Sequence, residues 1–125
     1  MADTPPTDAL RKFQENHPDL YRKGLPLWEQ GAGVAELAWN RTDVLEVIEA
    51  LERDGQCILG GDVWEVVEGI QPTPSHANWY FDPSGQRSDS WASKEIAERY
   101  IESYPQTGDS VHFVLVWRPA AWARS

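Results

Sequence analysis

Cysteine is almost absent from this sequence of 125 residues, in which Cys57 stands alone. A lone cysteine cannot form an internal disulfide, so nothing indicates an oxidising compartment. Long hydrophobic runs are missing too: the densest one, Val111 to Trp117, contains His112 and is far too short to cross a bilayer. Residues 1–6 lack the basic start and apolar stretch of a signal peptide. We therefore expect a cytoplasmic protein.

Basic residues are scarce: 11 Lys and Arg stand against 20 Asp and Glu, giving a net charge of −9. Such a chain repels phosphate backbones and anionic lipids, which argues against nucleic-acid or membrane binding. The acids concentrate between Asp43 and Glu68, where eight of them accompany one base, Arg53. One interpretation is a solvated helix face. The other is a surface that attracts a basic partner and speeds its capture.

Motifs for catalysis or metal binding are also lacking. The three histidines, His17, His76 and His112, are scattered and lack the paired spacing of a zinc site, so we expect no metal and no cofactor. A hydrolytic group around His76 would need Ser75, Asn78 and Asp82, but no nucleophile motif supports it. Cys57, between apolar neighbours, is expected to pack as a small hydrophobe. We therefore expect no enzyme.

The hydrophobic share of 41% and charged share of 25% are typical of a globular protein, and the length suits one domain. Helices are expected from Thr7 to His17, restarting after Pro18 and ending at Gly24, then from a Thr42 cap to Gly55, and from Ser90 to Tyr104. In the last of these, Ile96, Ala97, Tyr100, Ile101 and Tyr104 share the apolar face.

Strands are expected at residues 34–39, 57–59, 63–67, 78–82 and 111–117. The pair Gly60-Gly61 interrupts the second and third of these, as a bulge, a tight turn or a close backbone approach. The last strand is apolar on both faces, which predicts a central position in a sheet. The order of elements predicts an α+β fold: one domain over residues 1–125, with a mixed or antiparallel sheet, about three helices, and flexible ends at residues 1–6 and 119–125.

Two short strings give the sequence a family resemblance: Ile58 to Trp64, which includes Leu-Gly-Gly-Asp-Val, and Asn78 to Tyr80. Together with the Thr42 helix, the Glu68-Gly69 turn and a following helix, they resemble the immunity protein 40 family over roughly Val34 to Trp117. These are small bacterial proteins of polymorphic toxin systems, taken to protect the producing cell by binding a cognate toxin. The resemblance implies a toxin partner, without catalysis or cofactor, and assigns no functional residue.

The sequence thus predicts a stoichiometric toxin inhibitor whose partner is basic. Its candidate contact residues combine acids with an aromatic side chain: Asp62, Glu65, Glu68, Trp79 and Asp82. Seven tryptophans are present; most should lie in the core, and any remaining ones would serve as exposed anchors. The alternatives are an acidic adaptor without a toxin and a small hydrolase.

Overall fold

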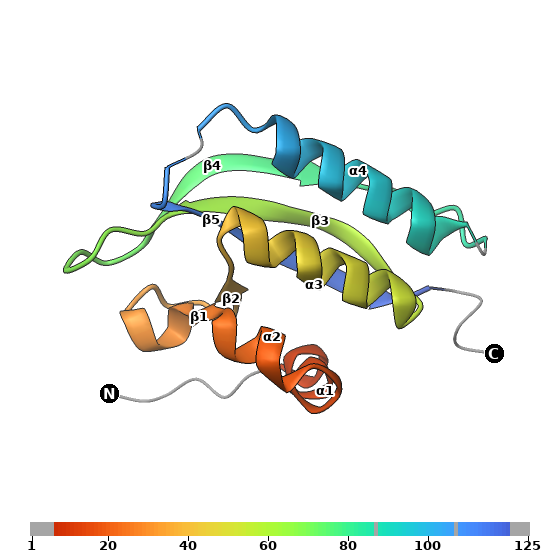
Figure 1. The fold of residues 1–125 in the computed structure, drawn as a ribbon, viewed down its shortest axis with the longest axis horizontal. Helices are drawn as coiled ribbons and strands as arrows, with labels where there is room; N and C mark the ends of the chain where they lie inside the picture. Colours follow the sequence, from red (N-terminus) through yellow and green to blue (C-terminus); the bar gives the residue numbers. More distant parts are fainter. Residues whose placement is uncertain (1–6, 87, 107, 121–125) are drawn as a thin grey trace.

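Four α-helices, one short 3-10 helix and two antiparallel sheets follow one another in the computed structural model, which describes residues 7–86, 88–106 and 108–120 (Figure 1). The α+β class predicted from the sequence is confirmed. In chain order the elements are α1 (Asp8–Asn16), α2 (Pro18–Lys23), β1 (Leu25–Pro26), η1 (Leu27–Gln30), β2 (Leu37–Ala38), α3 (Arg41–Arg53), β3 (Gln56–Glu65), β4 (Thr73–Tyr80), α4 (Asp89–Ser103) and β5 (Val111–Pro119).

The helices begin and end near the expected residues, with one correction. The Thr7 hydroxyl caps α1, Pro18 starts α2, and α4 matches the predicted third helix. The cap of α3 is Asn40, not Thr42: its side-chain oxygen accepts the Asp43 N–H at 2.8 Å. Because a bridge between Trp39 and Phe113 holds the chain extended up to that point, the helix can begin immediately after it.

The larger sheet has the order β4-β3-β5, so β3 is its central strand. The prediction that β5 is central was wrong: beyond β5 only the single Trp39–Phe113 bridge continues the pairing among the described residues. β5 is apolar on both sides because α3 and α4 cover one face and the segment 25–39 covers part of the other. The two strands expected on either side of Gly60-Gly61 are one strand, because β3 continues through the pair; the register shift between Ile58 and Gly60 agrees with the predicted bulge.

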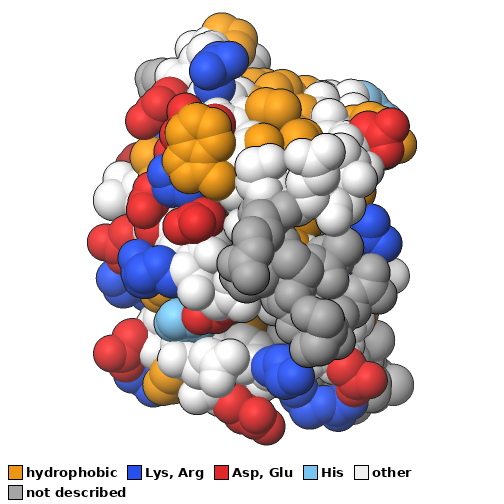
Figure 2. Space-filling view, turned by 90° about the vertical axis from the view of Figure 1, so that its right-hand side faces the viewer, with side chains coloured by type: hydrophobic (Ala, Val, Ile, Leu, Met, Phe, Trp, Pro, Cys, Tyr) orange, Lys and Arg blue, Asp and Glu red, His pale blue; other side chains and the backbone are white. Residues whose placement is uncertain are grey.

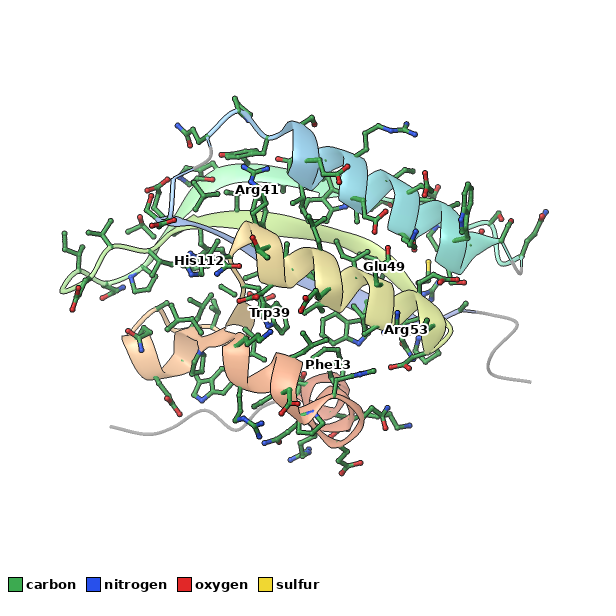
Figure 3. The ribbon with its side chains drawn as sticks, in the orientation of Figure 1. Phe13, Trp39, Arg41, Glu49, Arg53 and His112 are labelled. Atoms are coloured by element: carbon green, nitrogen blue, oxygen red, sulfur yellow. The ribbon has the colours of Figure 1, made fainter. Side chains whose placement is uncertain are left out.

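One face of the sheet is covered by α3 and α4, which lie side by side in front of it (Figure 1). α3 contributes its whole apolar stripe to this core, and the strands contribute Ile58, Val63, Val111, Phe113 and Leu115. α1 closes the lower side, where the ring of Phe13 stands edge-on to Trp39 with centroids 5.9 Å apart (Figure 3). Burial of this apolar area supplies most of the free energy that holds the two layers together.

Arg41, at the start of α3 (Figure 3), fastens the two covering helices to each other. Its guanidinium donates to the carbonyl oxygens of Ile101, Tyr104 and Gln106, at the end of α4. The last carbonyls of a helix have no intrahelical partner, so a cation placed there satisfies them and complements the helix dipole. Ile96, which was expected on the apolar face of α4, is instead 39% exposed, because the helix turns that position away from the sheet.

β4 is an edge strand and starts earlier than predicted, at Thr73. Its pairing with β3 shifts between Asp62 and Trp64, and His76 in this stretch takes a left-handed φ of 69°. β5 extends to Pro119, and the Ala120 N–H bonds to the Gly55 carbonyl at 3.0 Å. The predicted flexible ends were residues 1–6 and 119–125; of these, 1–6 and 121–125 lie outside the described residues, whereas Pro119 belongs to β5. No helix within the described part of the chain is long and apolar enough to span a membrane.

Candidate functional site

The second face of the sheet is only half covered. The segment 25–39 packs Leu27 and Ala38 over Trp64 and Val114. Beyond that patch no helix covers this face of the sheet, because α3 and α4 pack on the other face. We call this uncovered area the open sheet surface, and its residues are Leu59, Gly60, Gly61, Asp62, Asn78, Tyr80 and Val116.

Two cross-strand rows build the open sheet surface. In the first row Gly60 pairs with Tyr80 on one side and Val116 on the other; in the second, Asp62 pairs with Asn78. Paired residues of antiparallel strands point to the same face, and neighbouring strands lie about 4.8 Å apart. Tyr80 and Val116 therefore stand roughly 10 Å apart across a glycine that has no side chain. The result is a shallow hollow of about 410 Å³.

The glycine pair is required by its surroundings, as the predicted close backbone approach implied. Gly60 has a φ of 150°, and a Cβ there would collide with the carbonyl oxygen of Trp79. A Cβ on Gly61 would meet the Val114 carbonyl oxygen and the Trp79 ring. No larger residue fits at either position without moving backbone atoms. The hollow between Tyr80 and Val116 is therefore a fixed feature of the fold.

Both rims of the hollow carry exposed hydrophobic side chains. Tyr80 is 79% exposed and Val116 is 42% exposed. Val116 also borders a second hollow, of about 240 Å³, whose lining includes Glu36 from the segment before β2. The surface therefore continues past β5 toward Glu36. An exposed tyrosine beside a depression is a common element of protein-binding surfaces.

Two carboxylates, Asp62 on the open sheet surface and Glu36 in the adjoining hollow, give this side of the sheet a negative potential. Burial, followed by the charge of Asp62, raises the pKa of Glu36 above its ordinary value. Within the described residues, no Lys, Arg or His lies within ion-pair distance of either carboxylate. Two neighbouring acids without a basic partner attract a cation from outside the chain.

The acids of α3 are in a different situation. Lys23 lies 3.6 Å from Glu46, and Lys94 lies 3.3 Å from Glu49 and 3.4 Å from Glu98. Figure 2 shows acidic and basic side chains interleaved along one side of the end of the molecule where α3 ends and α4 begins. The acidic stretch that dominates the sequence is therefore partly neutralised on its helix, and its effective charge there is reduced.

The five predicted contact residues do not form one cluster. Asp62 lies at the centre of the open sheet surface, and Asp82 is exposed just beyond the end of β4. Glu65 ends β3 at the opposite end, with Glu68 exposed in the connection that follows. Trp79 points to the covered face, where its ring stacks on Tyr100 with centroids 4.7 Å apart.

Sequence reasoning missed three residues of the site: Glu36, Tyr80 and Val116. Alternation along β4 was the available signal for Tyr80, because a Trp79 under the helices places the next side chain on the other face. The same alternation along β5 predicts that Val116 lies on the open face, because Leu115 before it is buried on the covered face. Nothing in the sequence connects Glu36 to Asp62, since they are brought together only when the segment 25–39 folds over the sheet.

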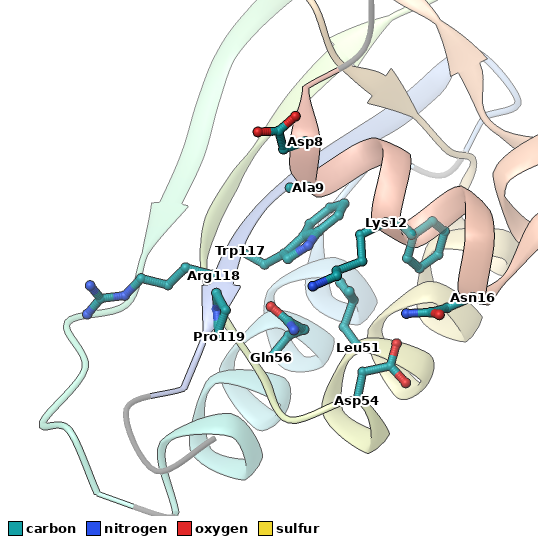
Figure 4. Close-up of a pocket in the computed structure, with 11 residues that line it drawn as sticks. Asp8, Ala9, Lys12, Asn16, Leu51, Asp54, Gln56, Trp117, Arg118 and Pro119 are labelled. Carbon is teal, nitrogen blue, oxygen red and sulfur yellow. The ribbon is translucent and has the colours of Figure 1, made fainter. Parts of the chain in front are cut away.

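Another hollow, of about 400 Å³, lies between α1, the end of α3 and β5 (Figure 4). Its lining includes Lys12, Asp54 and Arg118, and the Trp117 ring projects from β5 toward α1. Charges of both signs surround it, so it selects no particular ligand charge. Asp54 is already engaged, because its carboxylate lies 2.7 Å from the His17 ring.

The described residues contain no group of three His, Cys, Asp or Glu side chains placed to hold a metal ion. The hydrolytic group considered around His76 is not supported by the geometry, since the Ser75 hydroxyl donates to the Val63 carbonyl at 2.9 Å. Burial lowers the pKa of His112 below its ordinary value, and the ring lies at the backbone of Ser110.

Comparison with known proteins identifies a family. A family model described as Immunity protein 40 matches residues 29–117 of the chain. The matched range includes Glu36, all of the open sheet surface and both helices that cover the opposite face. No curated protein and no solved structure matches the chain.

Proposed function

Since the chain belongs to the immunity protein 40 family, we propose that it binds and neutralises a cognate toxin as a stoichiometric, non-catalytic inhibitor. The observation that carries this proposal is the open sheet surface. Tyr80 and Val116 stand exposed on the sheet beside Asp62, a carboxylate without a basic partner among the described residues. Exposed hydrophobic side chains around a rigid depression are the features that bind protein partners tightly.

The partner we propose is basic. Asp62 and Glu36 supply a short-range negative potential at the surface, while Glu65, Glu68 and Asp82 extend it toward both ends of the sheet and steer a basic toxin during approach. Trp79 acts from the covered face, where its ring fills the space beside Gly61. In this assignment the role of exposed anchor belongs to Tyr80.

The test is co-expression with a toxin-like protein, which the proposal expects to be encoded directly upstream of this chain. The unmodified protein should protect the cells and form an equimolar complex that is separable by gel filtration. Wild-type protein that neither protects nor forms a complex contradicts the proposed function. Binding of several unrelated basic proteins with similar affinity would favour an acidic adaptor without a toxin.

The charge component is measured separately by binding kinetics at several salt concentrations. Reversing Asp82 to lysine should slow association and flatten its dependence on salt, because long-range steering is screened by ions. The control is Asp109→Lys, which changes the net charge equally from the loop that precedes β5. Equal effects of the two variants would mean that only the total charge matters and that Asp82 has no special place.

A further inference from the structure

The hollow between Tyr80 and Val116 has the shape and charge to take one side chain of the partner. We propose that an arginine of the toxin enters it, with its aliphatic stem between Tyr80 and Val116 and its guanidinium at Asp62. This inference rests on the proposed function and adds the chemical identity of the group that is bound. It follows from the cross-strand rows, which place an apolar gap beside an acid and an amide.

The dimensions of the gap favour a long, slender side chain. Gly60 and Gly61 line it between the two rims and contribute no side chain to the gap. Its walls are an aromatic ring and a branched aliphatic group, which suit the methylene stem of a basic residue. The exposed Tyr80 ring can also stack on a guanidinium, a contact that favours arginine over lysine.

The polar end of the gap favours a planar cation. Asp62 and Asn78 are direct cross-strand partners, so an acidic and an amide side chain leave the same face of the sheet at neighbouring positions. A guanidinium presents several N–H donors in a fixed fork and can donate to the oxygens of both side chains at once. Glu36 lies close enough to Asp62 for the two charges to interact. An uncharged guest would leave these carboxylates uncompensated.

The first experiment uses a small probe and does not depend on the toxin. The amide spectrum of the full chain is followed by NMR during titration with N-acetyl-arginine amide. The matched control is the citrulline analogue, which has the same shape without the charge. Arginine should shift the amides of Gly60, Gly61 and Asp62, and citrulline should not. Equal shifts with both compounds, or arginine shifts confined to other residues, would overturn the proposal.

Two variants sharpen the probe experiment. Asp62→Asn should weaken arginine binding at least about fivefold, because a hydrogen bond to a charged group is replaced by a neutral one. Asp109→Asn removes the same charge from a site at the far end of β5 and should leave the affinity within about twofold of the wild type. If both variants weaken binding equally, the hollow is not the site.

The second experiment asks whether the toxin uses the same hollow. Val116→Arg places a guanidinium within diagonal reach of Asp62 and should fill the gap from within the chain. It should weaken toxin binding at least about tenfold, whereas Val116→Met, which keeps an apolar rim, should change it less than about threefold. Thermal melting checks that both variants fold. Unchanged toxin affinity of Val116→Arg would overturn the arginine assignment.

The outcomes separate the two proposals. If the wild-type chain binds the toxin but the Asp62 and Val116 variants bind equally well, the proposed function stands and the hollow is not its contact. If the probe binds as expected and the toxin does not bind at all, the proposed function fails while the preference of the hollow for a guanidinium remains. A complex between two copies of this chain through Arg118 would appear as a dimer in ultracentrifugation and would overturn the assignment to a toxin.

Discussion

The two faces of the same sheet have opposite characters. On the covered face, Val63, Phe113 and Leu115 are buried beneath α3 and α4. On the open face, the residues one step along from Val63 and Leu115 are Asp62 and Val116. Because side chains alternate along a strand, the same strands supply both a core and the open sheet surface. The comparison teaches that stability and the proposed binding can be changed independently at the uncovered positions Tyr80 and Val116, but not at Trp64 and Val114, which are buried under the segment 25–39.

The largest expected effect comes from the covered face. Phe113 is fully buried, and its ring lies edge-on to Tyr104 and beneath the Arg41 guanidinium. Phe113→Ala should lower the free energy of unfolding by about 3–5 kcal/mol, through lost burial and the cavity left behind. Val116→Ala, the matched truncation on the open face, should cost less than about 1 kcal/mol. Chemical denaturation measures both, and equal losses would mean that the two faces do not differ in this way.

The next largest effect on stability is expected at Gly61, in the central strand between the two faces. Gly61→Val should destabilise the protein by about 1–3 kcal/mol, because the added atoms collide with the Val114 carbonyl oxygen and the Trp79 ring. The control is Gly33→Ala: this glycine has a positive φ of 78°, but nothing lies within 4 Å of the added Cβ. Its cost should be about 1 kcal/mol, from the backbone alone. An unchanged melting temperature of Gly61→Val would contradict the packing role of the glycine.

The neighbouring residues Trp79 and Tyr80 compare the faces most directly. Tyr80→Ala should leave the free energy of unfolding within about 0.5 kcal/mol and weaken toxin binding by about 2 kcal/mol, mainly through faster dissociation. Trp79→Ala should do the reverse, because its ring stacks on Tyr100 under α4. Surface plasmon resonance combined with thermal melting distinguishes them. If Trp79→Ala speeds dissociation of the toxin and Tyr80→Ala leaves the dissociation rate unchanged, the exposed anchor is Trp79 and not Tyr80.

The smallest expected effect lies in the helices of the covered face. Burial, and the nearby carboxyl of Glu49, raise the pKa of Glu98 from 4.5 to about 7. Between these values the folded protein holds a proton that the unfolded chain has released, so stability should decline as the pH rises through this window. The pKa of Glu49 is lowered, chiefly by its hydrogen bond with Glu98, so its own contribution to stability is lost only as the pH falls below the ordinary value, outside this window. Because solvent screens this partly exposed group, we expect Glu98→Gln to flatten the pH dependence by about 1 kcal/mol or less.

Urea denaturation at pH 5 and pH 8 measures this difference. Glu102→Gln, an exposed position on the same helix, is the control and should follow the wild type. A Glu98→Gln variant whose stability declines with pH as steeply as the wild type would show that Glu98 ionises normally.

Local patterns were sufficient for most of the secondary structure. The caps, prolines and apolar stripes of α1, α2 and α4 depend on residues within a few positions of each other, and their predicted ranges hold within about two residues. The wrong predictions concern features that are determined by contacts between residues far apart in the sequence. The start of α3 depends on the bridge between Trp39 and Phe113, and the edge position of β5 depends on which strands come to lie beside it.

The candidate site shows the same division. The sequence predicted Asp62 as a contact residue and the close approach at the glycine pair, because both follow from local chemistry. It did not predict Tyr80, Val116 and Glu36 as members of the same surface. Those residues come from three separate segments, and no short-range pattern records which side of the sheet the helices will cover.

The sequence by itself determined the α+β class, the acidic charge, the helices and the family, since each is a property of composition or of short strings. Only the tertiary structure decided that β3 is central, that the acids of α3 are partly paired by Lys23 and Lys94, and that Glu36 comes within range of the charge of Asp62. The physical reason is that alternation gives each strand two equivalent faces. The packing of α3 and α4 on one face makes the other available for binding.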